Sequence, residues 1–362
     1  MSSSEHTTQH DREHLTQRVL EMCIDHGFAL AGVSSLEPSE HINFYNNWID
    51  SGKHGAMSYL ARNVDLRLHP AYMIENARCA VVVADLYANR QEPSLPLHSG
   101  AGRVARYAQG RDYHKVIRKR LHAICDVLRE AHTGHEHRAF VDTAPVLERE
   151  LAQRAGLGWI GKHTLLIHPT LGSRYFLGGF FTTLDLVHTP QRKQIVDHCG
   201  SCTRCIDACP TDAITPYALD ASRCISYLTI EQRNAIDGSL QAQLNGWLFG
   251  CDICMDVCPH NSPMGLGKSQ IAPNDAYQSS RQSFDPFVVL AWSESDRVSA
   301  LAGSSMTRAS LGMLKRNAML ILATDQTTDR AKFVKTLQQL AASEDEPELT
   351  RQTAQHLLSH AG

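Results

Sequence analysis

Cysteine residues gather in two runs near the middle of the chain, and their spacing suits iron–sulfur chemistry. The first run reads C-x2-C-x2-C-x3-C-P over residues 199–210, and the second reads C-x2-C-x3-C-P over residues 251–259. Three thiolates spaced this closely on one loop can hold three corners of a four-iron cube, and in two-cluster ferredoxins the fourth Cys of such a run ligates the other cluster. The runs therefore predict two 4Fe-4S clusters that share ligands crosswise.

The two clusters need one more thiolate ligand than the two runs supply. Two four-iron clusters take eight thiolates and the two runs supply seven, because Leu248 stands where a complete second run would have Cys. Cys224 is the remaining Cys of this region. We therefore assign one Cys of the second run to the first cluster, and the full assignment is Cys199, Cys202, Cys205 and Cys258 for cluster 1, and Cys209, Cys224, Cys251 and Cys254 for cluster 2.

A disulfide framework and a zinc ribbon are the alternatives for these cysteines. Disulfides are not expected in a long chain that starts MSSSEHTTQHDREH, without an apolar signal segment. A zinc ribbon uses two C-x2-C pairs, and it leaves the fourth Cys of the first run and both Cys-Pro steps without a role. We expect a cytoplasmic protein with no membrane span, because the longest apolar run, residues 80–86, is short and contains Asp85.

The overall composition is that of a globular protein with more than one domain. The chain has 362 residues, of which 43% are hydrophobic and 20% charged, and its formal net charge is −3. This net charge does not indicate a nucleic-acid partner, so any surface that binds nucleic acid has to be a local basic patch. The most basic window, residues 103–121, carries seven Arg and Lys against the single acid Asp112. It is either a solvated helix face or a surface that follows phosphates.

The elements around the cysteine runs predict three domains. Helical patterns at 10–26 and 42–63 alternate with apolar strands at 28–33, 79–86, 163–167 and 175–182, which predicts an α/β (α+β) N-terminal domain. After the cysteine runs, amphipathic patterns at 286–304, 308–323, 332–342 and 348–359 predict a C-terminal α-helical repeat, HEAT-like in type. We place the domains at 1–190, 191–268 and 269–362.

Asp142 is the candidate catalytic group of the N-terminal domain. A strand predicted at 138–142 ends at this residue, and a helix predicted at 146–155 follows. An acid at the carboxyl end of a strand lies where α/β folds place ligands and catalytic groups. Asp142 or Thr143 could equally cap the helix, with Pro145 in its first turn, so both interpretations stay open at this point.

Taken together, these segments resemble the epoxyqueuosine reductases, cobalamin- and iron–sulfur-dependent enzymes that complete queuosine in tRNA. The resemblance covers most of the chain. It rests on G-A-M-S-Y-L-A-R from Gly55 with Arg67, A-R-Y-A-Q-G-R-D-Y-H-K from Ala105, V-D-T-A-P-V-L-E-R-E-L-A from Val141, A-G-L-G-W-I-G-K-H-T-L-L-I from Ala155, both cysteine runs and L-K-R-N from Leu314. The blocks that contain D-T-A-P-V-L-E-R and G-L-G-W-I-G-K are the specific ones.

The resemblance implies the activity and the site. The enzyme would reduce the epoxide of epoxyqueuosine in tRNA to the alkene of queuosine, with two electrons from an external low-potential donor and loss of the oxygen as water. Asp142 would donate a proton, which requires a carboxyl group that burial keeps protonated. The first domain would bind cobalamin, with contacts to Arg67, Tyr107, Asp142, Lys162 and Thr164. The second domain would be ferredoxin-like, and the tail with the basic window would contact tRNA through Arg111, Lys115, Arg118, Arg308, Lys315 and Arg316.

Some residues depart from known patterns. The cobalamin signature D-x-H-x-x-G begins at Asp112 and His114 but has Ile117 in place of Gly, which is consistent with a corrin held without a His ligand. His163 stands where the family commonly has Asn, and His260 where it commonly has Trp. We expect a monomer. The alternatives are an iron–sulfur electron-transfer protein, which would bind no corrin, and a small-molecule reductive dehalogenase, against which the basic window argues.

Overall fold

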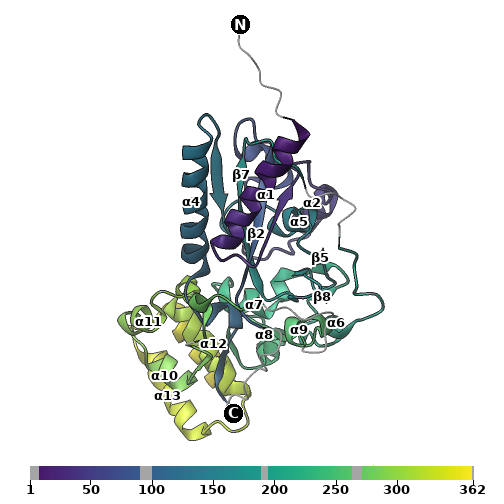
Figure 1. Ribbon diagram of the computed structural model, residues 1–362. Coiled ribbons are helices and arrows are strands. Elements are labelled where there is room, and N and C mark those ends of the chain that lie inside the picture. Colours follow the sequence, from purple (N-terminus) through teal and green to yellow (C-terminus); the bar gives the residue numbers. More distant parts are fainter. Residues whose placement is uncertain (1–7, 90–99, 189–194, 263–270, 280, 361–362) are drawn as a thin grey trace.

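The N-terminal part of the protein is built on a four-stranded sheet. The computed structural model describes residues 8–89, 100–188, 195–262, 271–279 and 281–360 (Figure 1). The strands lie in the order β1–β2–β7–β4, and each neighbouring pair is antiparallel. Their bounds are Leu30–Ser34 for β1, Cys79–Leu86 for β2, His137–Phe140 for β4 and Tyr175–Thr182 for β7. The domain is therefore α+β, because an α/β layer would have parallel strands.

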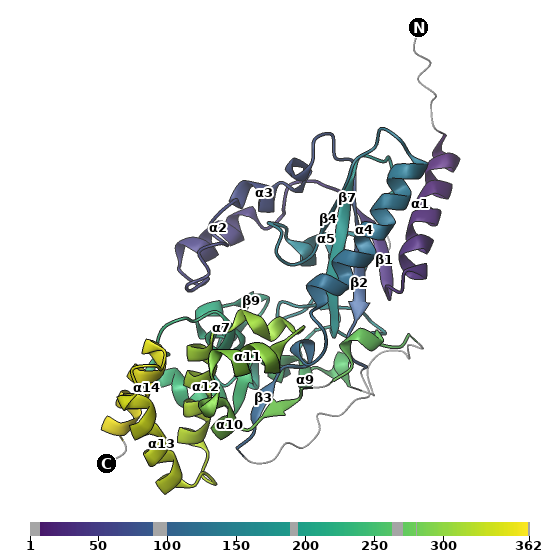
Figure 2. The same ribbon diagram turned by 90° about the vertical axis from the view of Figure 1, so that its left-hand side faces the viewer.

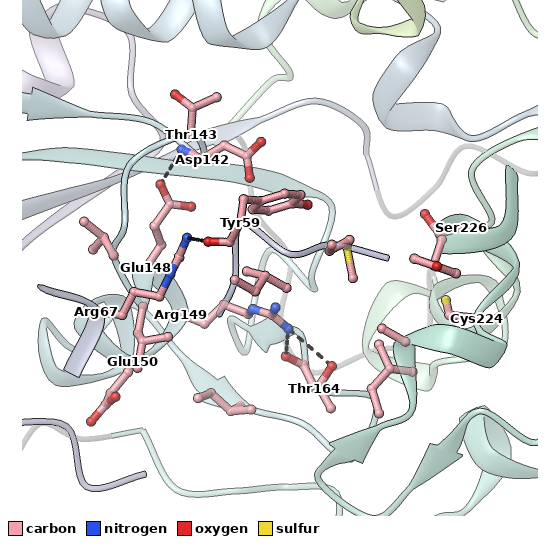
Figure 3. Close-up of a pocket in the computed structure, with 18 of the residues that line it drawn as sticks. Tyr59, Arg67, Asp142, Thr143, Glu148, Arg149, Glu150, Thr164, Cys224 and Ser226 are labelled. Carbon is pink, nitrogen blue, oxygen red and sulfur yellow. Dashed lines mark hydrogen bonds between the residues drawn. The ribbon is translucent and has the colours of Figure 1, made fainter. Parts of the chain in front are cut away.

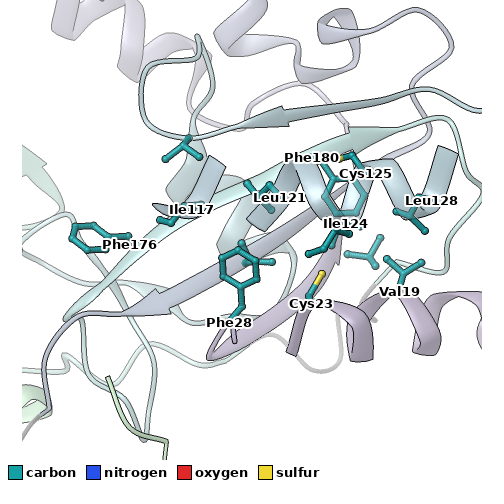
Figure 4. Packing of buried hydrophobic residues seen from close by; sticks show 14 of the residues in the cluster. Val19, Cys23, Phe28, Ile117, Leu121, Ile124, Cys125, Leu128, Phe176 and Phe180 are labelled. Carbon is teal, nitrogen blue, oxygen red and sulfur yellow. The ribbon is translucent and has the colours of Figure 1, made fainter. Parts of the chain in front are cut away.

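Strand β2 forms the centre of two hydrophobic cores. All eight of its residues are buried, and successive side chains point to opposite faces of the sheet. Val81 and Val83 pack on one face against helices α1 (Gln9–Asp25) and α4 (Tyr113–Ala131), which lie along the sheet (Figure 4). Val82 and Ala84 pack on the other face against α5 (Glu148–Arg154). A strand covered on both sides has to be apolar throughout, which explains the continuous run in the sequence.

A second sheet crosses the predicted domain boundaries. It has the order β10–β3–β11, with β3 (Gly102–Val104) between β10 (Trp247–Phe249) and β11 (Ser283–Phe284). Each strand comes from a different one of the three predicted domains, so those domains share a sheet. The predicted boundaries at 190/191 and 268/269 lie outside the described residues, and the division stays a prediction.

The C-terminal part is helical, as the sequence pattern predicted (Figure 2). Helix α12 (Leu311–Thr324) is central and is buried from Leu311 to Leu322. It contacts α10 and α14, and α13 packs against α14. The bounds of the surrounding helices are Pro286–Ala291 for α10, Glu294–Leu301 for α11, Arg330–Ala342 for α13 and Glu348–Ser359 for α14. A HEAT-like repeat stays a prediction.

Three predicted elements differ most from the structure. The helix predicted at 42–63 ends early, because α2 covers only Ile42–Asp50 and the chain then turns at Gly52 and Gly55, whose φ values are 67° and 57°. The strand predicted at 163–167 is shortened to β6 (Leu166–Ile167), which pairs with β5 (Trp159–Ile160). The helix predicted at 286–304 is two helices. Among the described residues, no helix combines the length and the apolar character needed to cross a membrane.

Candidate active site

A cavity of about 1900 Å³ is lined by all three parts of the chain. Its walls come from segments within 41–67, 107–118, 142–164, 195–231 and 305–308, and from Phe249 (Figure 3). Pockets for drug-sized molecules measure about 300–1,000 Å³. This cavity therefore has room for a large cofactor together with part of a macromolecular substrate.

Asp142 faces the cavity from the turn between β4 and α5. Strand β4 ends at Phe140, two residues earlier than predicted, and Asp142 adopts a left-handed backbone with φ 46°. Its backbone N–H donates to Oε1 of Glu148 at 2.5 Å (Figure 3). The N-cap of α5 is Leu147, without a side-chain cap, so the capping alternative for Asp142 is wrong. The side chain of Asp142, 55% exposed, is instead available in the cavity.

Two side chains at the start of α4 donate to the Asp142 carboxylate. The Tyr113 hydroxyl donates to Oδ2 at 3.0 Å, and Nε2 of His114 lies 2.9 Å from the same oxygen. The other His114 nitrogen, Nδ1, lies 2.8 Å from Oδ1 of Asp112, which also caps α4 by accepting from the His114 backbone N–H. A ring whose nitrogens both face carboxylate oxygens serves as a double donor, and this is the imidazolium form.

The charges at this site place the proton on His114 and Glu148. Enclosure by protein acts to raise the pKa of Asp142, but the hydrogen bond and charge of His114, with Tyr113 and Arg308, outweigh it and leave the pKa lowered. Burial acts to lower the pKa of His114, but Asp142 and Asp112 outweigh it and raise the pKa. Burial and the Asp142 charge raise the pKa of Glu148 to about 8. The expectation that burial keeps Asp142 protonated is therefore wrong, because a cationic partner lies beside it.

Arg67, Tyr107 and Thr164, three of the predicted cofactor contacts, also line the cavity. Nε of Arg67 is buried and has no hydrogen-bond partner among the described residues. Thr164 has a left-handed backbone with φ 68°, and its carbonyl and hydroxyl oxygens accept from Arg149 at 2.5 and 3.2 Å (Figure 3). Arg149 thus fixes the turn that presents Thr164.

Lys162, the other predicted cofactor contact, lies elsewhere. It is not among the described residues that line the cavity. Its Nζ donates to the carbonyl oxygens of Gly200 at 2.6 Å and Cys202 at 3.1 Å. The structure therefore corrects the prediction for Lys162: the side chain holds the loop of the first cysteine run.

The four cysteines assigned to cluster 1 lie together. Burial, with the nearby thiols of Cys199 and Cys202, raises the pKa of Cys205. Burial, with Cys199 and Cys205 nearby, raises the pKa of Cys258 to about 11. The short helix α6 (Arg204–Asp207) carries Cys205 and lies against α9 (Ile253–Asp256), so that the end of the second run reaches the first.

The four cysteines assigned to cluster 2 form a neighbouring set. Burial, with Cys209 nearby, raises the pKa of Cys224. Burial, followed by Cys224, Asp252 and Cys209, raises the pKa of Cys251. Burial, followed by Cys251 and Cys224, raises the pKa of Cys254. The Cys205 thiol of the first set also raises the pKa of Cys254, so the two sets adjoin.

The second cysteine set reaches the cavity, because Cys224 is one of the residues that line it. In the described part of the chain, no three His, Cys, Asp or Glu side chains converge closely enough to hold one metal ion. A four-iron cube instead takes its thiolates at separate corners.

The two histidines that depart from the family pattern are buried near the first cysteine set. His260 meets the ring of Trp159 edge-on, with 4.9 Å between ring centroids, and Trp159 packs with Cys258. His163 is 4% exposed, and burial and the Arg149 charge lower its pKa to about 4. Both rings therefore fill positions inside the protein.

The predicted tRNA contacts fall into two groups. Arg111, Lys115 and Arg118 are exposed near the start of α4, and Arg118 lines the cavity together with Arg308. Lys315 and Arg316 are each 1% exposed.

Their hydrogen bonds explain this burial. Lys315 donates to both carboxylate oxygens of Glu346, and Arg316 donates to the carbonyl oxygens of Leu228, Gln232 and Asn234. The prediction that they contact tRNA phosphates is therefore wrong, because both cations are used inside the protein.

Three partners of Asp142 are not among the residues predicted from the sequence. His114 was noted only as part of an incomplete cobalamin signature, and Tyr113 and Glu148 were not singled out. The sequence shows only that Asp112, Tyr113 and His114 are consecutive and that Glu148 follows Asp142 by six residues. Nothing in the sequence shows that α4 and the turn after β4 meet.

Comparison with family models identifies the class of protein. Residues 198–261 match the model described as a 4Fe-4S double cluster binding domain. The protein is therefore a two-cluster iron–sulfur protein, and the large cavity beside the cluster region fits an enzyme rather than a simple electron carrier.

The particular family follows from a second model and from known relatives. Residues 67–143 match the model of epoxyqueuosine reductase QueG. The chain is 37% identical over 325 residues to the epoxyqueuosine reductase of Pseudomonas aeruginosa, covering 88% of each chain. It belongs to the epoxyqueuosine reductase family, which is a family of oxidoreductases.

Two solved structures share the fold. One is an epoxyqueuosine reductase with an epoxyqueuosine-modified tRNA-Tyr stem loop; it has a TM-score of 0.81 and 26% identity, covering 96% of this chain and 90% of that one. The other is the Bacillus subtilis epoxyqueuosine reductase with an aspartate catalytic loop swung out of the active site; it has a TM-score of 0.83 and 25% identity, covering 96% of this chain and 91% of that one.

Proposed function

We propose that this protein reduces epoxyqueuosine in tRNA to queuosine. One observation carries the proposal: Asp142 and Cys224, a candidate proton donor and a candidate cluster ligand, line the same cavity of about 1900 Å³. Family membership supports it, and so does the similarity to a reductase that was solved with an epoxyqueuosine-modified stem loop.

The reaction balances with two electrons and two protons. Both carbon–oxygen bonds of the epoxide break, a carbon–carbon double bond forms, and the oxygen leaves as water. The electrons come from an external low-potential one-electron donor. The protein has to deliver protons to the departing oxygen, because an alkoxide or hydroxide is a poor leaving group without them.

Asp142 is the proposed proton donor to this oxygen. Its carboxyl faces the cavity on a strained turn that Glu148 holds, and His114 lies beside it as a source of protons. The Bacillus subtilis relative with its aspartate catalytic loop supports a catalytic aspartate on a loop in this family. Asp142 is therefore proposed to act as a carboxylate that is protonated through its partner rather than by burial.

The cysteine sets are proposed to hold two 4Fe-4S clusters, which supply single electrons at low potential when bound. Cluster 1 takes Cys199, Cys202, Cys205 and Cys258, and cluster 2 takes Cys209, Cys224, Cys251 and Cys254. The mutual proximity of the thiols within each set supports this division. Lys162 supports cluster 1 by fixing the carbonyl groups of its loop.

The cavity is also proposed to bind cobalamin, whose reduced cobalt supplies electrons to the substrate when bound. The residues present fit this cofactor. The volume exceeds that of an ordinary ligand pocket, Arg67 offers a buried unpaired Nε to an amide or phosphate oxygen, and Tyr107 and Thr164 add hydroxyl groups. Both ring nitrogens of His114 are engaged by carboxylates, which agrees with a corrin held without this histidine as a cobalt ligand.

The tRNA is proposed to approach along the start of α4 and the cavity rim. Arg111, Lys115 and Arg118 give an exposed cationic surface, and Arg308, paired with Glu231, stands over the ring of Tyr59 in the cavity wall. Cations fix phosphates, and aromatic rings hold unstacked bases. We further propose a monomer that works in the cytoplasm, where tRNA and a reducing compartment are found.

Genetic complementation tests the proposed function. A bacterial strain without its epoxyqueuosine reductase accumulates epoxyqueuosine in tRNA, and expression of this chain should replace it with queuosine. The Asp142→Asn variant, expressed at the same level, should leave epoxyqueuosine in place. Persistence of epoxyqueuosine with the wild-type chain, at an expression level that gives bound iron, would reject the proposal.

The alternative functions make different predictions. An electron-transfer protein would bind iron but no cobalamin, so the visible spectrum after cobalamin loading separates it from the proposed enzyme. A small-molecule dehalogenase would bind cobalamin but not tRNA. Tight tRNA binding that weakens steeply with salt excludes it.

A further inference from the structure

The reduction needs two protons for each epoxide, and Asp142 has one carboxyl group. A carboxyl donates one proton and must then be protonated again before it can donate a second. Within the described residues, the hydrogen bonds on the carboxylate oxygens of Asp142 come from Tyr113 and His114. Burial and the charge of Asp142 raise the pKa of Tyr113 far above its usual value, so the phenol keeps its proton. His114 is therefore the partner that can give one up.

We propose that His114 is a positioning residue that returns a proton to Asp142 between the two proton transfers of the reduction. This inference rests on the proposed function. The geometry forms a continuous chain: Oδ1 of Asp112, then Nδ1 and Nε2 of His114, then Oδ2 of Asp142, with contacts of 2.8 Å and 2.9 Å.

The surroundings hold the imidazole in this chain. Asp112 is the N-cap of α4, so the same carboxylate fixes the helix start and the ring. The Tyr113 ring stacks between His114 and Phe176, with ring centroids 4.0 and 4.1 Å away, and the Phe176 stack is nearly parallel at 5°. The His114 side chain remains 24% exposed, so protons from solvent can reach it.

Charged and titratable groups from several elements set the proton affinity of this pair. They are Asp112, Tyr113, Asp142, Glu148, Tyr107 and Arg308. Burial acts to lower the pKa of His114, and the two aspartates reverse this and raise it above 6.5. The imidazolium therefore persists at a pH where an ordinary histidine is neutral, and its charge is lost as pH rises through the raised pKa.

The proton transfers then balance over one turnover. Nε2 of His114 passes its proton to the Asp142 carboxylate, which gives it to the oxygen as the first carbon–oxygen bond breaks. His114 takes up a proton from solvent and protonates Asp142 again, and Asp142 gives this second proton as the oxygen leaves as water. His114 then takes up another proton from solvent, which restores the starting state. Asp112 accepts a hydrogen bond from Nδ1–H throughout and stabilises the imidazolium. No oxidant or reductant beyond the two electrons of the proposed reaction is required.

A merely structural His114 predicts a different outcome. It would hold the turn, and its replacement would lower stability without moving the pH dependence of the reaction. The variants His114→Gln and Asp112→Asn separate these roles, because Gln can still donate to Asp142, and Asn can still accept at Oδ1 and cap α4. His122→Gln is the matched control, since His122 is exposed on the same helix.

The experiment combines single-turnover kinetics of the holoenzyme with ¹⁵N-histidine NMR of the full chain. Substrate tRNA is mixed with pre-reduced enzyme between pH 5.5 and 9, and the His114 signal is assigned by its loss in His114→Gln. The wild-type rate should fall at high pH with the deprotonation seen by NMR. We call this fall in rate at high pH the limb. Asp112→Asn should move both the limb and the titration of His114 to lower pH.

For His114→Gln we expect a rate constant about 10²-fold lower, without that limb and with unchanged tRNA affinity. The proposal is overturned if the limb stays in place in Asp112→Asn, or if His114 is neutral across the range in the wild type. If the wild type converts the substrate but the limb does not move in Asp112→Asn, only the proton transfer from His114 is rejected, and the proposed function stands. If the wild-type enzyme with both clusters and cobalamin bound does not convert the substrate, the proposed function is rejected together with the proton transfer from His114.

Discussion

Replacement of Asp142 by Asn should remove the carboxyl group that carries the proton while leaving the architecture of the site. Asn tolerates the left-handed backbone that this residue adopts with φ 46°, and its amide oxygen can still accept from the Tyr113 hydroxyl. Its backbone N–H can still donate to Glu148. The substitution therefore tests the carboxyl group itself.

The expected loss of rate is large and the loss of stability is small. Removal of a general acid lowers the rate constant of the proton-transfer step by about 10²–10⁴-fold. The charged hydrogen bond from His114 is worth about 1 kcal/mol, taken at the low end because the Asp142 side chain is more than half exposed. Asp142→Ala should lose roughly 1–2 kcal/mol more, because Ala disfavours a positive φ.

Single-turnover conversion of epoxyqueuosine in tRNA, followed by nucleoside analysis, measures the first effect, and thermal unfolding measures the second. Iron and cobalamin contents should match those of the wild type. Wild-type turnover by Asp142→Asn at equal cofactor content would refute the assignment of the proton donor. Loss of iron from the variant would show that the turn supports the clusters instead.

Three other predictions follow from the same contacts. Glu148 has a pKa raised from 4.5 to about 8 in the folded state, so its contribution to stability falls as pH rises through this window. In denaturant titrations, the free energy of unfolding of Glu148→Gln should therefore fall less steeply with pH between these values. The same pH dependence in the variant and the wild type would contradict the raised pKa of Glu148. Arg316→Met leaves three carbonyl groups without their donor, so it should lower the free energy of unfolding by about 3 kcal/mol or more. Its tRNA affinity at low temperature should be unchanged. A stable variant that no longer binds tRNA would show that Arg316 contacts tRNA after all. Arg118→Gln should weaken tRNA binding and reduce the slope of log affinity against log salt by about 1, and an unchanged slope would remove Arg118 from the phosphate contacts.

The sequence predicted elements best where one local pattern determines them. Strands β2 and β7 and helix α14 have the bounds that the apolar patterns predicted, because a strand buried on both faces and an amphipathic helix leave clear periodicities. The helix predicted at 42–63 failed because its apolar residues continue beyond Gly52 into turns that face the cavity. Strand direction was also beyond reach, since a buried apolar run looks the same in parallel and antiparallel sheets.

Charged residues show where local patterns mislead. Lys315 and Arg316 resembled a basic surface, yet α12 is central to the helical part and both side chains are used inside it. Lys162 resembled a ligand contact in a Gly-rich loop, yet it donates to the first cysteine loop. The partner of each cation comes from a distant segment, and such pairs are invisible without the fold.

The chemistry of Asp142 combines both situations. Its sequence context identified the residue as a candidate, while its hydrogen-bond partner His114 comes from another helix, 28 residues away in the sequence. The role of Asp142 as proton donor stays a prediction, whereas the expectation that burial raises its pKa is wrong, because His114 lies beside it. The cysteine spacing predicted the double-cluster domain because most of the cysteines lie within two short runs, and the assignment of each cysteine to a cluster stays a prediction.

The most direct test of the central claim is the nucleoside content of epoxyqueuosine-tRNA after incubation with anaerobically reconstituted protein, cobalamin and a counted supply of electrons. We expect that queuosine replaces epoxyqueuosine and that two electrons are consumed for each molecule formed. Unchanged epoxyqueuosine, with both clusters reduced and cobalamin bound, would contradict it.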